Sequence, residues 1–178
     1  MAKQMGLVNR GTPVSFLSIG IFKWMIYDAA IDKRMIFHEQ PMNFLPTMSV
    51  VGVLIESNGA ILLLRRQIGK SQELTWGVPG GKVDAGETEL EAAVREVQEE
   101  THLPLIESCL VGRGHFFVRY PDYDFTYTLF AYALADQPIV AISADEHSEF
   151  CWATPVASLR LPLIPDMDVC LKQVYHLD

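Results

Sequence analysis

Two apolar runs separated by the dipeptide Asn58-Gly59 constrain the fold more than any other feature of this sequence. The runs are residues 50–55 and 60–64. Asn-Gly between such runs is a strong signal for a two-residue β-hairpin turn. Neither run alternates apolar with polar residues, so both faces of the predicted hairpin should be covered by other parts of the chain.

Further strand and helix patterns follow along the chain. Residues 106–120 and 125–134 are predicted to form longer strands, and residues 139–142 and 149–153 shorter ones. Apolar residues have helical spacing within 165–177, and another helix is expected to begin just after Thr88. This order predicts an α/β fold with a mixed sheet between helices.

The helix expected after Thr88 carries an unusual charge. Residues 87–100 contain six glutamates and one base, Arg95, so most of the net charge of −8 is concentrated there. Glu96, Glu99 and Glu100 lie three and four positions apart and therefore share one helix face. Arg95 can pair with Glu91 and Glu99, which lie four residues away on either side.

Such a face of carboxylates has two interpretations. Closely spaced carboxylates raise one another's pKa or bind cations, and hard oxygen ligands suit Mg²⁺ or Mn²⁺. The alternative is an acidic helix face that is only solvated, which is the usual state of a charge run.

The spacing resembles the Nudix box, G-x5-E-x7-R-E-U-x-E-E-x-G-U, where U is aliphatic. The matching residues are Gly81, Glu87, Arg95, Glu96, Val97, Glu99, Glu100 and Leu103. His102 stands where the family has glycine, and histidine tolerates the left-handed helix end at a cost of about 1 kcal/mol or less. The resemblance extends from residue 49 to about residue 160.

The resemblance implies a fold, a reaction and a cofactor. The fold is the Nudix-type α/β/α sandwich with a mixed β-sheet, expected at 46–178 after an N-terminal extension at 1–45 of unassigned role. The reaction is hydrolysis of a phosphoanhydride bond in a nucleoside diphosphate linked to another group, by water attack on phosphorus. The cofactor is Mg²⁺, with Mn²⁺ as a possible substitute.

The substrate is less constrained by the resemblance. The short chain favours a (d)NTP-type nucleotide, as in nucleotide-pool-cleaning members of the family. Tyr120, which is 17 residues after Leu103, resembles a marker of dinucleoside-polyphosphate hydrolases, and nucleotide sugars remain a further alternative. A non-catalytic Nudix-like nucleotide-binding regulatory module is the alternative of another class, although such modules commonly lose the box glutamates that are present here.

The resemblance also assigns roles to residues. Metal binding is expected from the backbone at Gly81 together with Glu96, Glu99 and Glu100. Glu99 is the first candidate for the general base, and Glu146, in a loop before a strand, is the second.

Other residues are expected to support this set. Arg95 is counted among the catalytic residues, because it is expected to brace the box together with Glu87. Arg65 and Arg66 are expected to contact phosphate, unless one of them is a solvated strand end. His115 and His147 have no identifiable partner and are expected to be structural. Six aromatic residues are candidates for stacking on a base or for core positions: Phe116, Phe117, Tyr120, Tyr123, Phe125 and Tyr127.

Composition excludes several classes of protein. The 178 residues, 49% of them hydrophobic, suit one globular domain, and the acidic charge argues against nucleic acid as a partner. Three widely separated cysteines favour a reduced, cytoplasmic protein over disulfides or a zinc site. The apolar run at 14–22 faintly resembles a signal peptide but is too short to span a membrane. Apolar residues in the extension make a homodimer contact possible.

Overall fold

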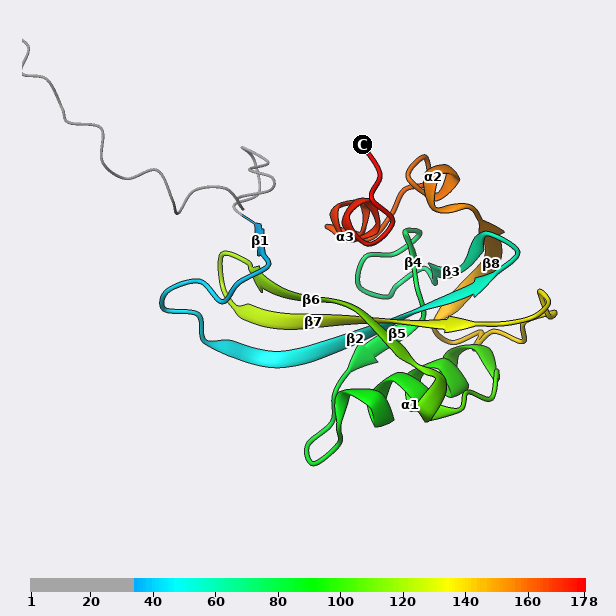
Figure 1. Cartoon of the computed structure of the whole chain (residues 1–178), viewed down its shortest axis with the longest axis horizontal. Helices are drawn as coiled ribbons and strands as arrows, with labels where there is room; N and C mark the ends of the chain where they lie inside the picture. Colours follow the sequence, from blue (N-terminus) through cyan, green and yellow to red (C-terminus); the bar gives the residue numbers. More distant parts are fainter. Residues whose placement is uncertain (1–33) are drawn as a thin grey trace, which may run out of the picture.

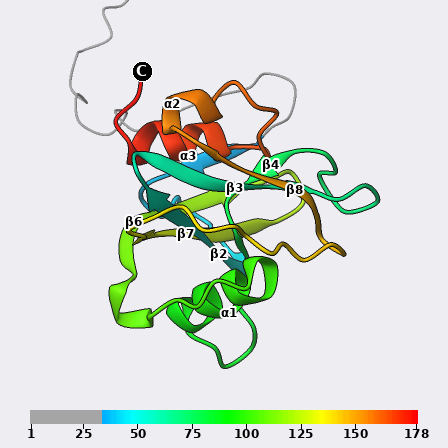
Figure 2. The same cartoon turned by 90° about the vertical axis from the view of Figure 1, so that its right-hand side faces the viewer.

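The computed structural model describes residues 34–178 and consists of a twisted sheet between two helical layers (Figure 1). Helix α1 (Glu89–Thr101) covers one face of the sheet. Helices α2 (Pro155–Ser158) and α3 (Met167–Val174) cover the other face (Figure 2). This arrangement confirms the predicted α/β/α sandwich. The apolar run at 14–22 lies outside the described residues.

The sheet has eight strands and is mixed, as predicted. The main path runs β1-β6-β7-β2-β3-β4, while β5 pairs with β2 and β8 pairs with β3. Strands β2 and β7 are parallel, and the other pairs are antiparallel. The strand bounds are β1 Met35–Phe37, β2 Pro46–Ser57, β3 Ala60–Arg66, β4 Trp76–Gly77, β5 Gly80–Lys82, β6 Val111–Arg119, β7 Asp124–Ala133 and β8 His147–Ala153.

The predicted hairpin is formed by β2 and β3. Asn58 and Gly59 have φ angles of 51° and 75°, and both angles are positive, as this type of two-residue turn requires. Consecutive residues of β2 enter different apolar clusters: Val53 packs with the α1 side chains, whereas Leu54 packs with those of α3. Burial on both faces explains why the run does not alternate.

Local signals set both ends of α1. The side chain of Thr88 accepts a hydrogen bond from the backbone N–H of Glu91, and the Glu91 carboxylate accepts one from the N–H of Thr88, which completes a capping box. The helix ends at His102 in the left-handed conformation, with φ 58° and ψ 15°. Ala93 and Val97 are fully buried against the sheet, and Glu96 and Glu100 lie next to them on the side of the helix that faces β5.

Two predicted strands differ in the structure. Residues 106–120 do not form one strand, because a 3₁₀ turn at Glu107–Cys109 satisfies local backbone groups before β6 begins at Val111. Residues 139–142 form no strand in the described chain. There Val140 is buried beside α1, and the N–H of Ser143 donates to the carbonyl of Glu100, so the segment is tied to the helix end and not to a strand.

The segment before residue 46 contributes to the sheet. Strand β1 pairs with β6, with Ile36 opposite Val118, and Ile36 is 5% exposed within the α3-side core. The expected extension at 1–45 therefore includes one strand of the folded unit. No helix among residues 34–178 is both long and apolar enough to cross a membrane.

Candidate active site

Two glycines allow the acidic helix to approach the sheet closely. Strand β5 runs between β2 and α1, and it begins at Gly80 and Gly81. A Cβ added at Gly80 would lie 2.1 Å from the carbonyl oxygen of Val51, and one added at Gly81 would lie 2.3 Å from Oε1 of Glu96. The backbone of β5 therefore abuts the carboxylates directly.

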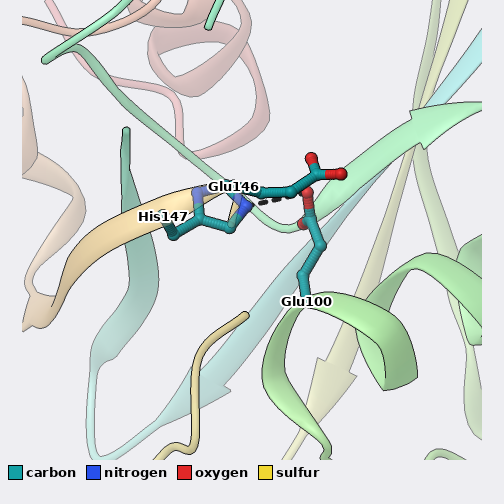
Figure 3. Close-up of side chains that lie close together, drawn as sticks. All are labelled: Glu100, Glu146 and His147. Atoms are coloured by element: carbon teal, nitrogen blue, oxygen red, sulfur yellow. Dashed lines mark hydrogen bonds and ion pairs between the residues drawn. The ribbon is translucent and has the colours of Figure 1, made fainter. Parts of the chain in front are cut away.

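Glu100 is the most buried carboxylate of the site. It is 4% exposed, and each of its oxygens has a partner. Oε2 accepts a hydrogen bond of 2.9 Å from the N–H of Gly80, and Oε1 lies 2.8 Å from Nε2 of His147 (Figure 3). The carboxylate is thus held between β5 and the start of β8.

Glu96 lies one helical turn earlier and is also largely buried, with 15% of its side chain exposed. Burial raises the pKa of this carboxyl, and the nearby Glu100 and Glu99 raise it further, whereas Arg95 opposes the shift. A carboxylate in this situation is stabilised by additional positive charge.

Arg95 braces the start of the helix against the loop that precedes it. Its Nε and Nη2 donate to the two oxygens of Glu87, both at 2.9 Å, and Nη2 also donates to the carbonyl of Lys82 at 3.0 Å. Nη1 donates to Glu96 at 2.8 Å and lies 3.4 Å from Glu99. The expected pairing with Glu99 is present, but that with Glu91 is wrong, because the capping box engages the Glu91 carboxylate.

The two candidate general bases lie in different surroundings. The side chain of Glu99 is 60% exposed, and its Oε2 lies 3.4 Å from Nη1 of Arg95. The side chain of Glu146 is 44% exposed, and Oε2 lies 3.8 Å from Nη1 of Arg66. One ligand atom each from Glu100, Glu146 and His147 lies within 4.8 Å of the others, and Figure 3 shows the three side chains together.

These groups fit a divalent cation. Glu100 and Glu146 offer carboxylate oxygens, which are the ligands that Mg²⁺ and Mn²⁺ take in proteins. The pKa of Glu96 is raised chiefly by burial, with smaller contributions from the neighbouring Glu100 and Glu99. A cation there would offset the repulsion between neighbouring carboxylates.

The two arginines at the end of β3 point to different neighbours. Arg65 pairs with Glu149 of β8 and lies over the ring of Trp76. Arg66 lines the cavities beside the carboxylates and approaches Glu146. The structure therefore brings Arg66, and not Arg65, to the site.

Two adjoining cavities lie between β5, β8 and α3. The smaller, of about 170 Å³, is lined by Gly80, Glu100 and His147 among others. The larger, of about 410 Å³, reaches Gly81 and is lined on one side by aromatic side chains. Arg66, Gln72 and Ile164 line both cavities, so the two lie side by side. The aromatic residues of the larger cavity are Tyr120, Tyr123, Phe125 and Tyr127.

The six aromatic candidates thus separate into two groups. Phe116 is fully buried in the core, and Phe117 packs edge-on against Phe44 and His115. The other four face the larger cavity, where the hydroxyl of Tyr120 donates to Asp166 at 3.2 Å.

His147 is the site residue that the sequence interpretation missed. It was expected to be structural and without a partner, yet it is 4% exposed and hydrogen-bonded to Glu100. Its position directly after Glu146 is the only sequence signal, and the partner lies 47 residues earlier. His115, in contrast, bonds to Thr128 at 2.8 Å and lines neither of the two cavities.

Comparisons with known proteins agree with this geometry. The family model described as the NUDIX domain matches residues 45–174. The chain is 28% identical over 140 residues to the CTP pyrophosphohydrolase of Escherichia coli strain K12. The matched region covers 72% of this chain and 90% of that protein.

Solved structures share the fold. The MutT protein from Methanosarcina mazei Go1 superposes with a TM-score of 0.63 at 24% identity, covering 76% of this chain and 97% of that one. A Nudix hydrolase from M. smegmatis gives a TM-score of 0.61 at 26% identity, covering 75% and 86%. The family model spans well over half of the sequence, and the box glutamates lie together beside a cavity. The chain therefore belongs to the Nudix family of hydrolases, which act on acid anhydrides.

Proposed function

We propose that this Nudix hydrolase cleaves a (d)NTP-type nucleotide to a nucleoside monophosphate and pyrophosphate. The observation that carries the proposal is that the aromatic cavity adjoins the smaller cavity beside Glu100, with Arg66 lining both. A nucleotide carries an apolar base and a charged polyphosphate, and these two parts suit an apolar cavity that adjoins a charged one. The similarity to a CTP pyrophosphohydrolase over 90% of its length supports the same class of substrate.

The larger cavity suits a nucleobase. Its volume of about 410 Å³ lies within the range of ordinary ligand pockets. Tyr120, Tyr123 and Phe125 form a group of mutually contacting rings along it. Stacking of a base on such rings contributes about 1–3 kcal/mol.

The carboxylates suit the phosphates through a cation. Glu96, Glu99 and Glu100 would hold Mg²⁺ or Mn²⁺ together with the carbonyl of Gly81, because the helix and β5 meet there. When bound, such a cation neutralises phosphoryl oxygens and favours water as a nucleophile. Arg66 lines both cavities and would orient the phosphates between them.

The reaction requires a base that removes a proton from the attacking water. The water oxygen forms a bond to phosphorus as the anhydride P–O bond breaks, and the water proton passes to a carboxylate. Glu99 and Glu146 are the two candidates, and Glu146 is favoured by its position beside Glu100 and Arg66. Replacing the base by glutamine should lower kcat by about 100-fold or more.

A substrate panel tests the proposal. CTP and the other (d)NTPs, a dinucleoside polyphosphate and a nucleotide sugar are each incubated with the enzyme and Mg²⁺ or Mn²⁺, and the products are resolved by chromatography. We expect a nucleoside monophosphate and pyrophosphate from a (d)NTP, and no turnover in excess EDTA. Preferred cleavage of either of the other two substrates would replace the (d)NTP assignment. Tight binding of nucleotides without any turnover would instead support a regulatory module.

Labelled water tests the direct attack. A single turnover in ¹⁸O-water, with enzyme in excess over substrate, should place the label in one phosphorus-containing product. Unlabelled products would mean that an oxygen of the enzyme attacks first.

A further inference from the structure

His147 is buried against Glu100, the most buried carboxylate of the site, and takes no part in the proposed reaction. The exposed fractions of the two side chains are 4% for His147 and 6% for Glu100, and Nε2 lies 2.8 Å from Oε1. Nδ1 of His147 is buried and has no hydrogen-bond partner among the described residues. A polar ring held at such depth by a single hydrogen bond requires an explanation.

The proton of this hydrogen bond can be placed from chemistry. A carboxylate only accepts hydrogen bonds, so Nε2 carries the proton and donates to Glu100. The neutral tautomer with its proton on Nε2 leaves no buried N–H without a partner, because Nδ1 then has only a lone pair. An imidazole N–H holds the carboxylate oxygen through one hydrogen bond, whereas the fixed charge of lysine or arginine at this position would compete with a cation.

The backbone fixes the two residues relative to each other. The N–H of Ser143 donates to the carbonyl of Glu100 at 2.9 Å, and the N–H of His147 donates to the carbonyl of Ser143 at 2.9 Å. The loop before β8 is therefore joined to the end of α1 through the main chain as well as through the imidazole.

Glu100 is consequently restrained at both oxygens. Gly80 donates to Oε2 from β5, and His147 donates to Oε1 from β8. Glu99, with 60% of its side chain exposed, has only a contact of 3.4 Å with Arg95 among the hydrogen bonds of the described residues. The protein thus orders one carboxylate of the box before a cation arrives.

We propose that His147 is a positioning residue, whose Nε2–H holds the Glu100 carboxylate in the orientation that binds the divalent cation. The inference rests on the proposed role of Glu100 as a metal ligand. Hydrogen-bonded partners of metal ligands typically contribute about 10–100-fold to metal affinity. Loss of the imidazole donor should therefore weaken cation binding before any substrate is present.

Three substitutions separate the hydrogen bond from the packing of the ring. His147→Gln keeps a donor, because the glutamine amide nitrogen reaches about the position of Nε2. His147→Asn keeps a polar amide, but its nitrogen reaches only about as far as Nδ1. His147→Leu fills the space without any donor.

The test is a titration of the full-length protein with Mn²⁺ alone, in which free Mn²⁺ is measured by electron paramagnetic resonance. We expect His147→Leu and His147→Asn to bind Mn²⁺ about 10-fold or more weakly, and His147→Gln to remain close to wild type. Excess Mn²⁺ should restore nucleotide cleavage by the weakened variants, which a purely structural role would not predict.

The outcomes of this titration decide between the inference and its alternatives. Equal Mn²⁺ affinity in all three variants and wild type would show that His147 does not position a ligand. If His147→Leu fails to fold in circular dichroism spectra, the Gln and Asn pair decides, and equal affinities in that pair contradict the inference. If the His147 variants bind Mn²⁺ more weakly than wild type but the wild type cleaves no nucleotide, the proposed function is contradicted and the inference is supported.

Discussion

At the scale of single residues, the site depends on how closely atoms can approach one another. Gly81 is the clearest case, since its missing side chain leaves the space that the Glu96 carboxylate occupies. Arg95 acts at the same scale, because its contacts with Glu87 and Glu96 hold the beginning and the middle of the box together. The pKa of Glu87 is lowered by that hydrogen bond, which keeps the brace ionised.

Gly81→Ala should reduce turnover strongly while the protein remains folded. The added methyl group would lie 2.3 Å from Oε1 of Glu96, so the carboxylate must move away from the cation site. We expect a fall in kcat and a higher Mn²⁺ requirement, measured by initial rates at several Mn²⁺ concentrations. Gly112→Ala in β6 is the matched control, because nothing lies within 4 Å of its added methyl group. Unchanged kinetics of Gly81→Ala would contradict the placement of the cation beside Glu96.

At the scale of elements, helix ends and strand ends carry the local strain and charge. Helix α1 ends at His102, an exposed residue with a positive φ of 58° where a side chain is disfavoured. Strand β6 ends at Arg119 and β7 begins at Asp124, and these two residues form an ion pair. Each of these features can be changed without touching the carboxylates of the box.

His102→Gly should leave stability unchanged or raise it by up to about 1 kcal/mol. Glycine adopts the left-handed conformation without steric cost, and this gain is partly offset by its greater freedom in the unfolded chain. Thermal unfolding followed by circular dichroism measures the effect. A drop of several degrees in Tm would reveal a stabilising contact of the histidine side chain.

Asp124→Asn should make the free energy of unfolding fall less steeply as the pH is lowered. Hydrogen bonds from Arg119 and from the N–H of Leu45 lower the pKa of Asp124 in the folded protein. A folded pKa below the unfolded value of about 3.9 means that this contribution is present above that pH and is lost as pH falls through the folded pKa. Urea midpoints measured from about pH 5 downward should fall less steeply in the variant.

The control for this prediction is Asp122→Asn, which removes an exposed acid from the same turn. Its pH profile should follow that of wild type. If both variants show the same acid profile as wild type, the Arg119–Asp124 pair does not contribute to pH-dependent stability.

At the scale of the whole molecule, the N-terminal strand closes the sheet beside the base cavity. Strand β1 lies at the sheet edge, and Ile36 contributes both to the core around α3 and to the wall of the larger cavity. The segment before residue 46 is thereby linked to stability and to the shape of the cavity.

Ile36→Ala should lower the free energy of unfolding by about 2 kcal/mol or more, because Ile36 is 5% exposed and its truncation leaves a cavity. Denaturant unfolding in urea measures this change. Met42→Ala in the same segment is the control, since Met42 is 86% exposed and its replacement should change stability by about 0.5 kcal/mol or less. Equal stability of the two variants would mean that β1 does not pack on the sheet in solution.

Local interactions account for what could be predicted from the sequence. The Asn58-Gly59 turn, the capping box at Thr88 and the left-handed end at His102 each depend on residues within a few positions of one another. The same holds for the carboxylates of the box, because helical periodicity alone brings them to one face. The errors at 106–120 and 139–142 arose where an apolar pattern did not reveal whether a strand partner was available.

The tertiary structure alone decided which residues meet at the site. A register shift between Arg65 and Arg66 lies where β3 pairs with His147, and only Arg66 reaches the cavities. Glu100 and His147 are 47 positions apart and meet because α1 packs on β2 and β5, whereas β8 pairs with β3, which is the neighbour of β2 in the sheet. Sequence determined the helix that carries the charge through short-range backbone geometry. Strand pairing over long range determined its partners, because such contacts depend on the register of the whole sheet.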